Sequence, residues 1–185
     1  MKSENTMLRV IHTIVGFFVV VVSFAQVPLN LTTNGELQGT GDAYITTPGE
    51  SVLIPNTHVK IIPPEHFMYS AELQGFVHGA TSSTMQISEI IGTSYIMVSK
   101  SLTPEYVESQ NFRYIEKRDI TTNDGHDGCV FILGFTNKGV DYERMMFLAG
   151  DYNNTIWINV SYPAVSRNLL FDIFNNSLLT AQFIK

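Results

Sequence analysis

The chain has one cysteine, Cys129, among its 185 residues, so it cannot form an intrachain disulfide. An exported protein without disulfides must be stabilised by its core alone. Cys129 is followed by Val130 and Phe131, and apolar neighbours of this kind raise the pKa of a thiol instead of lowering it. We therefore interpret Cys129 as a small buried apolar side chain and not as a catalytic nucleophile.

Runs of basic residues are also absent, and the formal net charge is −6. The nearest approach to a basic run is Lys117-Arg118, which has Glu116 and Asp119 on either side. Nucleic acids and anionic membrane surfaces are bound by clustered Lys and Arg side chains. The sequence therefore disfavours both as the main partner.

The chain lacks the common signatures of catalytic and metal sites. It has no G-x-S-x-G, no G-x-G-x-x-G and no zinc-ligand spacing of cysteines and histidines. The segment 123–128 fails the calcium-loop pattern and is interpreted as a turn. Asp141 and Glu143 lie close to Arg144 in sequence, and we interpret them as a solvated strand edge. We expect no catalytic residue, no metal and no cofactor.

An apolar run, Ile14–Val22, follows a basic N-terminal segment. It has the length of a signal-peptide core and is shorter than the roughly 20 residues that a membrane span needs. Ser23-Phe24-Ala25 then supplies small residues for cleavage before Gln26. We predict a signal peptide over 1–25, export to the periplasm or secretion from a bacterial host, and no stable membrane span after cleavage. A buried helix or a membrane anchor is the alternative.

Residues 26–49 are rich in Thr, Gly and Asn and are predicted to be a flexible linker. The remaining residues, 50–185, are long enough for one domain with a sizeable core. Within them, Gly128–Thr136, Val140–Ala149 and Thr155–Tyr162 are β-prone runs separated by polar turns. This spacing predicts an antiparallel meander.

The first two strands of this meander are apolar on both faces, so the sheet should be covered on both sides. One cover is predicted to be a C-terminal helix over 165–178. The other is a short helix that begins with Thr103 as its N-cap, or else the segment 65–81. Further strands are predicted at 51–54, 58–62, 84–91 and 112–122. The apolar stripe of the C-terminal helix is predicted to consist of Val165, Leu169, Leu170, Ile173 and Phe174.

The segment Glu65–Thr81 has no clear periodicity and is predicted to be a long irregular loop. Long loops inside compact domains are commonly functional or held down by their own aromatic side chains. A second hypothesis places a metal between two histidines of this loop, but a packing or surface role is favoured. The residues predicted to contact a partner are His66, Phe67, Tyr69, Phe76 and His78.

The order of these elements resembles the PsbP-like superfamily. That group includes the photosystem extrinsic protein, DcrB-type bacterial periplasmic proteins and a eukaryotic Ran-binding import factor. The resemblance covers about residues 50–183. It is carried by Ile54-Pro55-Asn56-Thr57-His58-Val59-Lys60-Ile61-Ile62-Pro63-Pro64 with Phe67, by Gln74-Gly75-Phe76, by Glu89-Ile90, by the Asp124-Gly125 and Gly150-Asp151 turns, and by Ser177-Leu178-Leu179.

The resemblance implies an α+β fold, an α/β/α sandwich around a central antiparallel sheet. It also implies an accessory role in binding or assembly rather than catalysis. Together with the predicted export signal, this favours an exported non-enzymatic module that binds a protein or an envelope component. Two alternatives stay open, a small secreted hydrolase or metal-dependent enzyme that uses His66 and His78, and a structural subunit.

Overall fold

The computed structural model describes residues 43–45 and 48–184. The predicted signal peptide, 1–25, and nearly all of the predicted linker, 26–49, lie outside these residues. The described residues belong to one compact unit, Asp42–Lys185. One short strand of this unit, β1 (Ala43–Ile45), falls within the range expected to be linker and pairs with strand β4.

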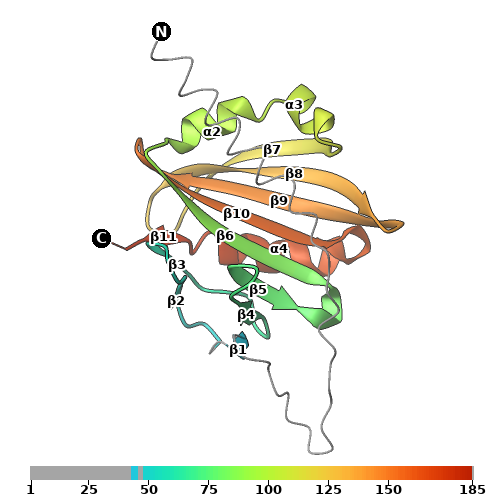
Figure 1. Cartoon of the computed structure of the whole chain (residues 1–185), viewed down its shortest axis with the longest axis horizontal. Coiled ribbons are helices and arrows are strands. Elements are labelled where there is room, and N and C mark those ends of the chain that lie inside the picture. Colours follow the sequence, from blue (N-terminus) through green and yellow to red (C-terminus); the bar gives the residue numbers. More distant parts are fainter. Residues whose placement is uncertain (1–42, 46–47, 185) are drawn as a thin grey trace, which may run out of the picture. The chain divides into compact units, whose positions relative to one another are not determined.

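A large antiparallel sheet forms the centre of this unit, with the strand order β1-β4-β5-β6-β10-β9-β8-β7 (Figure 1). A small sheet has the order β11-β3-β2. The strands of the large sheet after β1 are β4 (Met68–Ser70), β5 (Gly75–His78), β6 (Ser83–Ile91), β7 (Arg113–Thr121), β8 (Asp127–Asn137), β9 (Val140–Gly150) and β10 (Asn154–Pro163). Those of the small sheet are β2 (Val52–Leu53), β3 (Val59–Ile61) and β11 (Gln182–Phe183).

The predicted meander is confirmed as the consecutive strands β8, β9 and β10. The turn between β8 and β9 contains only Lys138 and Gly139, since Asn137 pairs with Val140. Both turn residues have positive φ, 49° and 80°. A two-residue turn of this kind matches the right-handed twist of the strands, and glycine adopts such a conformation at little cost.

Three α-helices are found in the described residues, α2 (Tyr95–Ser101), α3 (Pro104–Ser109) and α4 (Arg167–Leu178). Two 3₁₀ turns, η1 (Gly79–Thr81) and η2 (Ala164–Ser166), join strands and helices. The predicted start of α3 is confirmed, because Thr103 Oγ1 accepts a hydrogen bond from the Tyr106 N–H at 3.2 Å. The sequence did not predict α2, although Ser94 caps it in the same way.

Helices cover both faces of the sheet, as predicted (Figure 1). α4 packs on β10, while α2 packs on β8, β9 and β10 and α3 packs on β7. Alternate residues of each strand face the two helix layers. The main core lies on the α4 face and includes Val130, Ile132, Met145, Phe147, Ile158, Val160, Tyr162, Leu170, Phe174 and Leu178.

The predicted apolar stripe of α4 is correct only for Leu170 and Phe174. The other three predicted residues face solvent, with Val165 92%, Leu169 65% and Ile173 44% exposed. The helix carries two apolar rows at four-residue spacing, and periodicity alone did not separate them. Packing against the sheet determines which row is buried, because the Phe174 ring stacks on Tyr162 of β10 at 5.4 Å between centroids.

The prediction that Glu65–Thr81 is irregular is wrong. The segment forms β4, β5 and η1, and so extends the large sheet. The two strands have three and four residues, which is too short to show a sequence periodicity. Gly75 explains the tight fit of β5, because a Cβ there would lie 1.9 Å from the Met85 carbonyl oxygen of β6.

Candidate binding surfaces

Three of the predicted partner-contacting residues are in the core. Phe67 is 3% exposed, Tyr69 4% and Phe76 0%. The Phe67 ring meets the edge of Phe174 at 5.5 Å between centroids, so it helps to hold α4 against the sheet. The expectation that these aromatic side chains form a contact surface is therefore wrong. Binding of a partner by the rest of this segment stays a prediction.

The two histidines of that segment differ in their surroundings. His66 is exposed and has a positive φ of 67°. His78 is half-buried, stacks on the Phe67 ring at 5.1 Å and has Nδ1 2.8 Å from Thr81 Oγ1. The contact between His78 and Thr81 thus links the end of β5 to the 3₁₀ turn η1 that follows it. No group of three or more His, Cys, Asp or Glu side chains placed to hold a metal occurs within 43–45 and 48–184.

Cys129 is 1% exposed, and burial raises the pKa of its thiol to about 11. The interpretation of Cys129 as a small buried side chain in an apolar strand is therefore confirmed. A hollow of about 480 Å³ lies beside it, between α2 and strands β7 and β8. Tyr95, Lys117, Asp119 and Asp127 are among its lining residues. Lys117 Nζ lies 3.9 Å from Asp119, so this cation already has an acidic neighbour.

The interpretation of Asp141 and Glu143 as a solvated strand edge is wrong, because β9 lies between β10 and β8, although Asp141 itself is exposed. Glu143 is only 8% exposed, because β9 is a central strand and this side chain faces α4. Its carboxylate accepts hydrogen bonds from the Tyr162 hydroxyl at 2.9 Å and from Arg167 at 2.5 Å. Burial, and then the bond to Glu143, raise the pKa of Tyr162 well above its ordinary value.

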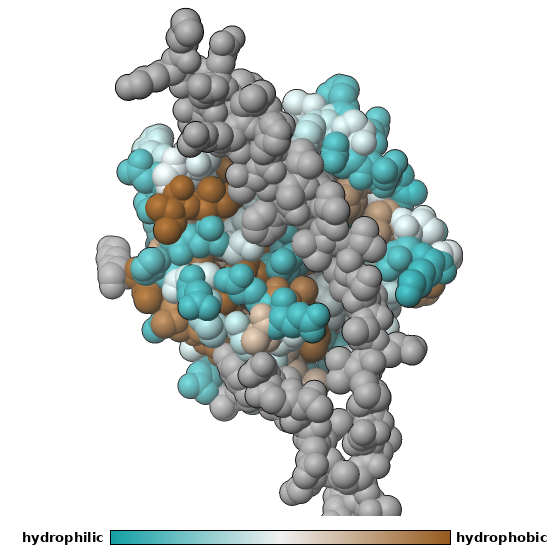
Figure 2. Space-filling model, in the orientation of Figure 1, coloured by the Kyte–Doolittle hydropathy of each residue, from teal (hydrophilic) through white to brown (hydrophobic). Residues whose placement is uncertain are grey.

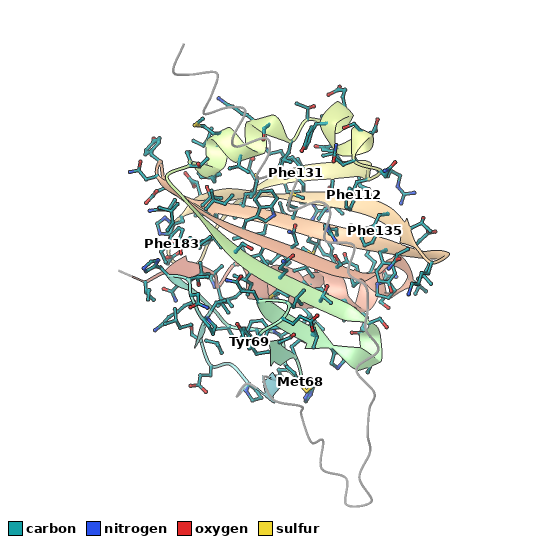
Figure 3. All side chains as sticks on the ribbon, viewed as in Figure 1. Met68, Tyr69, Phe112, Phe131, Phe135 and Phe183 are labelled. Atoms are coloured by element: carbon teal, nitrogen blue, oxygen red, sulfur yellow. The ribbon has the colours of Figure 1, made fainter. Side chains whose placement is uncertain are left out.

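The next residue, Arg144, faces the opposite side of the sheet and is 6% exposed. Its guanidinium lies 5.0 Å from the Phe112 ring centre and 5.1 Å from that of Phe135. Its Nε donates a hydrogen bond to Ser161 Oγ at 3.1 Å. Figure 3 shows Phe112 and Phe135 close together beside the sheet, below α3. Burial lowers the pKa of Arg144 to about 10, so the side chain is still cationic at neutral pH.

A second apolar row is exposed on α4 and the turn before it. We call Val165, Leu169 and Ile173 the outer row. The exposed polar residues Asn168, Asp172 and Asn176 border it. On the face shown in Figure 2, the described hydrophobic residues occur in groups among hydrophilic ones. In the described part of the chain, no helix has the length and apolar character needed to cross a membrane.

Comparison with known proteins defines the class of fold. No family model and no curated protein matches the chain. LpqN from Mycobacterium tuberculosis, described as involved in cell envelope biogenesis, matches with TM-score 0.50 and 13% identity over 80% of this chain and 87% of LpqN. This likeness and the strand order confirm the predicted α+β fold with its central antiparallel sheet.

Two further solved structures are similar to the chain at lower scores. Cyanobacterial PsbP (CyanoP) from Synechocystis sp. PCC 6803 gives TM-score 0.48 and 9% identity over 81% of this chain and 98% of that one. PA94 from Pseudomonas aeruginosa, a protein of unknown function, gives TM-score 0.47 and 14% identity over 76% of this chain and 96% of that one.

Proposed function

We propose that this chain is an exported, non-enzymatic accessory module that binds a protein of the cell envelope. The observation that carries the proposal is the outer row on η2 and α4, in which Val165, Leu169 and Ile173 are 92%, 65% and 44% exposed. Apolar side chains gathered on one helix face are typical of a surface that another protein covers. The fold likeness to LpqN, described as involved in cell envelope biogenesis, supports an envelope partner.

The chemistry of the helix suggests what kind of surface the partner offers. Apolar residues spaced by four lie along one line of the helix and can enter a hydrophobic groove together. The bordering residues Asn168, Asp172 and Asn176 include one acid and no base, so they do not favour an acidic partner surface. We therefore expect the partner to be a protein with an apolar groove.

The test places a photo-crosslinking amino acid at position 169 of the full-length chain, produced in its own host. We expect one principal crosslinked envelope protein. Ile173→Lys should reduce the yield of this adduct about tenfold, because a buried apolar contact at an interface centre contributes roughly 1–2 kcal/mol to binding. Asn176→Lys is the matched control, since it adds the same charge on the same helix outside the row.

The same variants separate a loss of binding from a loss of folding. Ile173 is 44% exposed and lies outside the buried row, so Ile173→Lys should leave the urea midpoint of unfolding unchanged. Absence of any adduct, or equal yields for Ile173→Lys and Asn176→Lys, would contradict the proposal.

A further inference from the structure

The outer row begins at the start of α4, and this end of the helix has little local stabilisation. The N-cap residue, Ser166, makes no side-chain hydrogen bond to the helix, and the first turn contains no acidic residue. The helix starts instead with Arg167, a cation at the end where the helix dipole favours an anion. The preceding turn, η2, has no buried residue. Without further contacts, Val165 and Leu169 would therefore lie on a segment that frays readily.

Arg167 supplies such contacts from the side of the helix that faces the sheet. Its guanidinium donates a hydrogen bond to the buried carboxylate of Glu143 in β9 and lies 3.7 Å from Glu116 of β7. It also lies 4.7 Å from the ring centre of Phe171, one turn further along α4. The side chains of Arg167 and Glu143 are 34% and 11% exposed, so salt and water screen this pair less than a surface pair. These contacts attach the first turn of α4 to two strands of the large sheet.

The outer row lies on another side of the same turn. Residues two positions apart in a helix point in different directions, so Val165 and Leu169 do not share the sheet-facing side with Arg167. Their exposure, 92% and 65%, agrees with this arrangement. The contacts that hold Arg167 against the sheet therefore also fix the direction in which the two apolar side chains point.

We propose that Arg167 is a positioning residue, which holds η2 and the first turn of α4 in the conformation that presents Val165 and Leu169 to the partner. It acts through its contacts with the sheet and not by touching the partner. This inference rests on the proposed function, because it concerns the same surface. An ordered surface loses less conformational entropy on binding, so the partner binds it more tightly.

Amide hydrogen exchange of the purified protein tests the positioning without any partner. Arg167→Met keeps a long side chain beside Phe171 and removes the charge. The amides of the first hydrogen-bonded turn, Leu170 and Phe171, should then exchange about tenfold faster. Those of Ser177 and Leu178, at the other end of α4, should change less than about twofold. Equal acceleration at both ends, or no acceleration at Leu170, would overturn the proposal.

Crosslinking from position 169 in the host then measures the effect on binding, at a temperature where circular dichroism shows every variant folded. Arg167→Met should lower the adduct yield about threefold or more. Glu116→Gln lies in β7 and acts through Arg167, so it should change both readouts in the same direction by a smaller factor. Arg118→Met is the matched control, because Arg118 also contacts Glu116 and the Phe171 ring but lies outside α4. It should leave both readouts unchanged.

The two readouts separate the possible failures. If Arg167→Met lowered the adduct yield while the amide of Leu170 exchanged at the wild-type rate, Arg167 would touch the partner directly and the positioning role would be wrong. If wild-type protein gave no adduct, the proposed function would fail. The exchange rates would still decide whether Arg167 orders the first turn.

Discussion

Glu143 and Arg144 are adjacent in β9 and lie on opposite faces of the sheet. The groups that stabilise a buried charge differ between these two faces. On the α4 face, Glu143 is paired with Arg167 and hydrogen-bonded to Tyr162. On the face covered by α2 and α3, Arg144 contacts two aromatic rings and one serine hydroxyl. Both side chains are buried, 8% and 6% exposed.

This difference shows that burial alone does not reveal the role of a charge. The Glu143 group completes a closed network next to the main core, so its role is structural. The Arg144 group has one side-chain hydrogen bond, to Ser161, and two aromatic neighbours, on a sheet face that also carries buried Thr84 and Asn159. The positive charge of Arg144 is therefore stabilised by aromatic rings and a hydroxyl group and not by a carboxylate, and this distinguishes the second face from the first.

The largest effect that would test the comparison is expected from Phe174→Ala. Phe174 is 0% exposed and packs on Tyr162 and Phe67 across the α4 face. Its removal should lower the free energy of unfolding by about 3–5 kcal/mol, because buried apolar area is lost and a cavity remains. Urea denaturation followed by circular dichroism measures the change.

Ile173→Ala is the control, since Ile173 precedes Phe174 in α4 and is 44% exposed. It should change the free energy of unfolding by about 1 kcal/mol or less. If the two variants were equally destabilised, the assignment of the buried and outer rows of α4 would be wrong.

Glu143→Ala should have an intermediate effect. It leaves the Tyr162 hydroxyl without its acceptor and removes the carboxylate that Arg167 contacts. We expect a loss of about 1–3 kcal/mol in the free energy of unfolding, the cost of an unsatisfied buried polar group. Differential scanning calorimetry at pH 7 checks it. Asp141→Ala, an exposed change two residues away in the same strand, should stay within about 0.5 kcal/mol. If Asp141→Ala lowered the free energy of unfolding as much as Glu143→Ala, the hydrogen bonds of Glu143 would not account for the effect.

The sequence was sufficient to predict the elements with a strong local signal. The meander β8–β10 has long apolar runs and polar turns, and α3 has a Thr103 cap followed by proline. The resemblance to the PsbP-like superfamily then predicted the sandwich correctly. Each of these features is encoded by neighbours in the chain, so no knowledge of distant contacts was needed.

The features that were missed depend on contacts between distant segments. β4 and β5 are defined by pairing with β6, and the buried row of α4 is defined by Tyr162 and Phe67. Glu143, next to Arg144, was interpreted as part of a solvated edge, and no role was predicted for Arg144 itself. Its position in a central strand, next to Ser161 of β10, became clear only from the sheet order. The sequence of β9 did contain a signal for the burial of Glu143 and Arg144, since apolar residues precede and follow them in the strand.

The smallest expected effect concerns the access of water to the sheet face covered by α2. The pKa of the Cys129 thiol on this face depends on that access. Burial raises the pKa of the native thiol to about 11, whereas the unfolded thiol keeps its ordinary pKa near 8.5. As pH rises from 7 to 9, most of the unfolded chains lose this proton and the native protein keeps it, so the contribution of Cys129 to stability falls by roughly 0.8 kcal/mol. Urea unfolding of the wild type and of Cys129→Ala at both pH values measures this contribution as the difference between them. If the difference in stability between the two proteins did not change with pH, water would reach the thiol beneath α2. The face covered by α2 would then be less well shielded from water than the structure indicates.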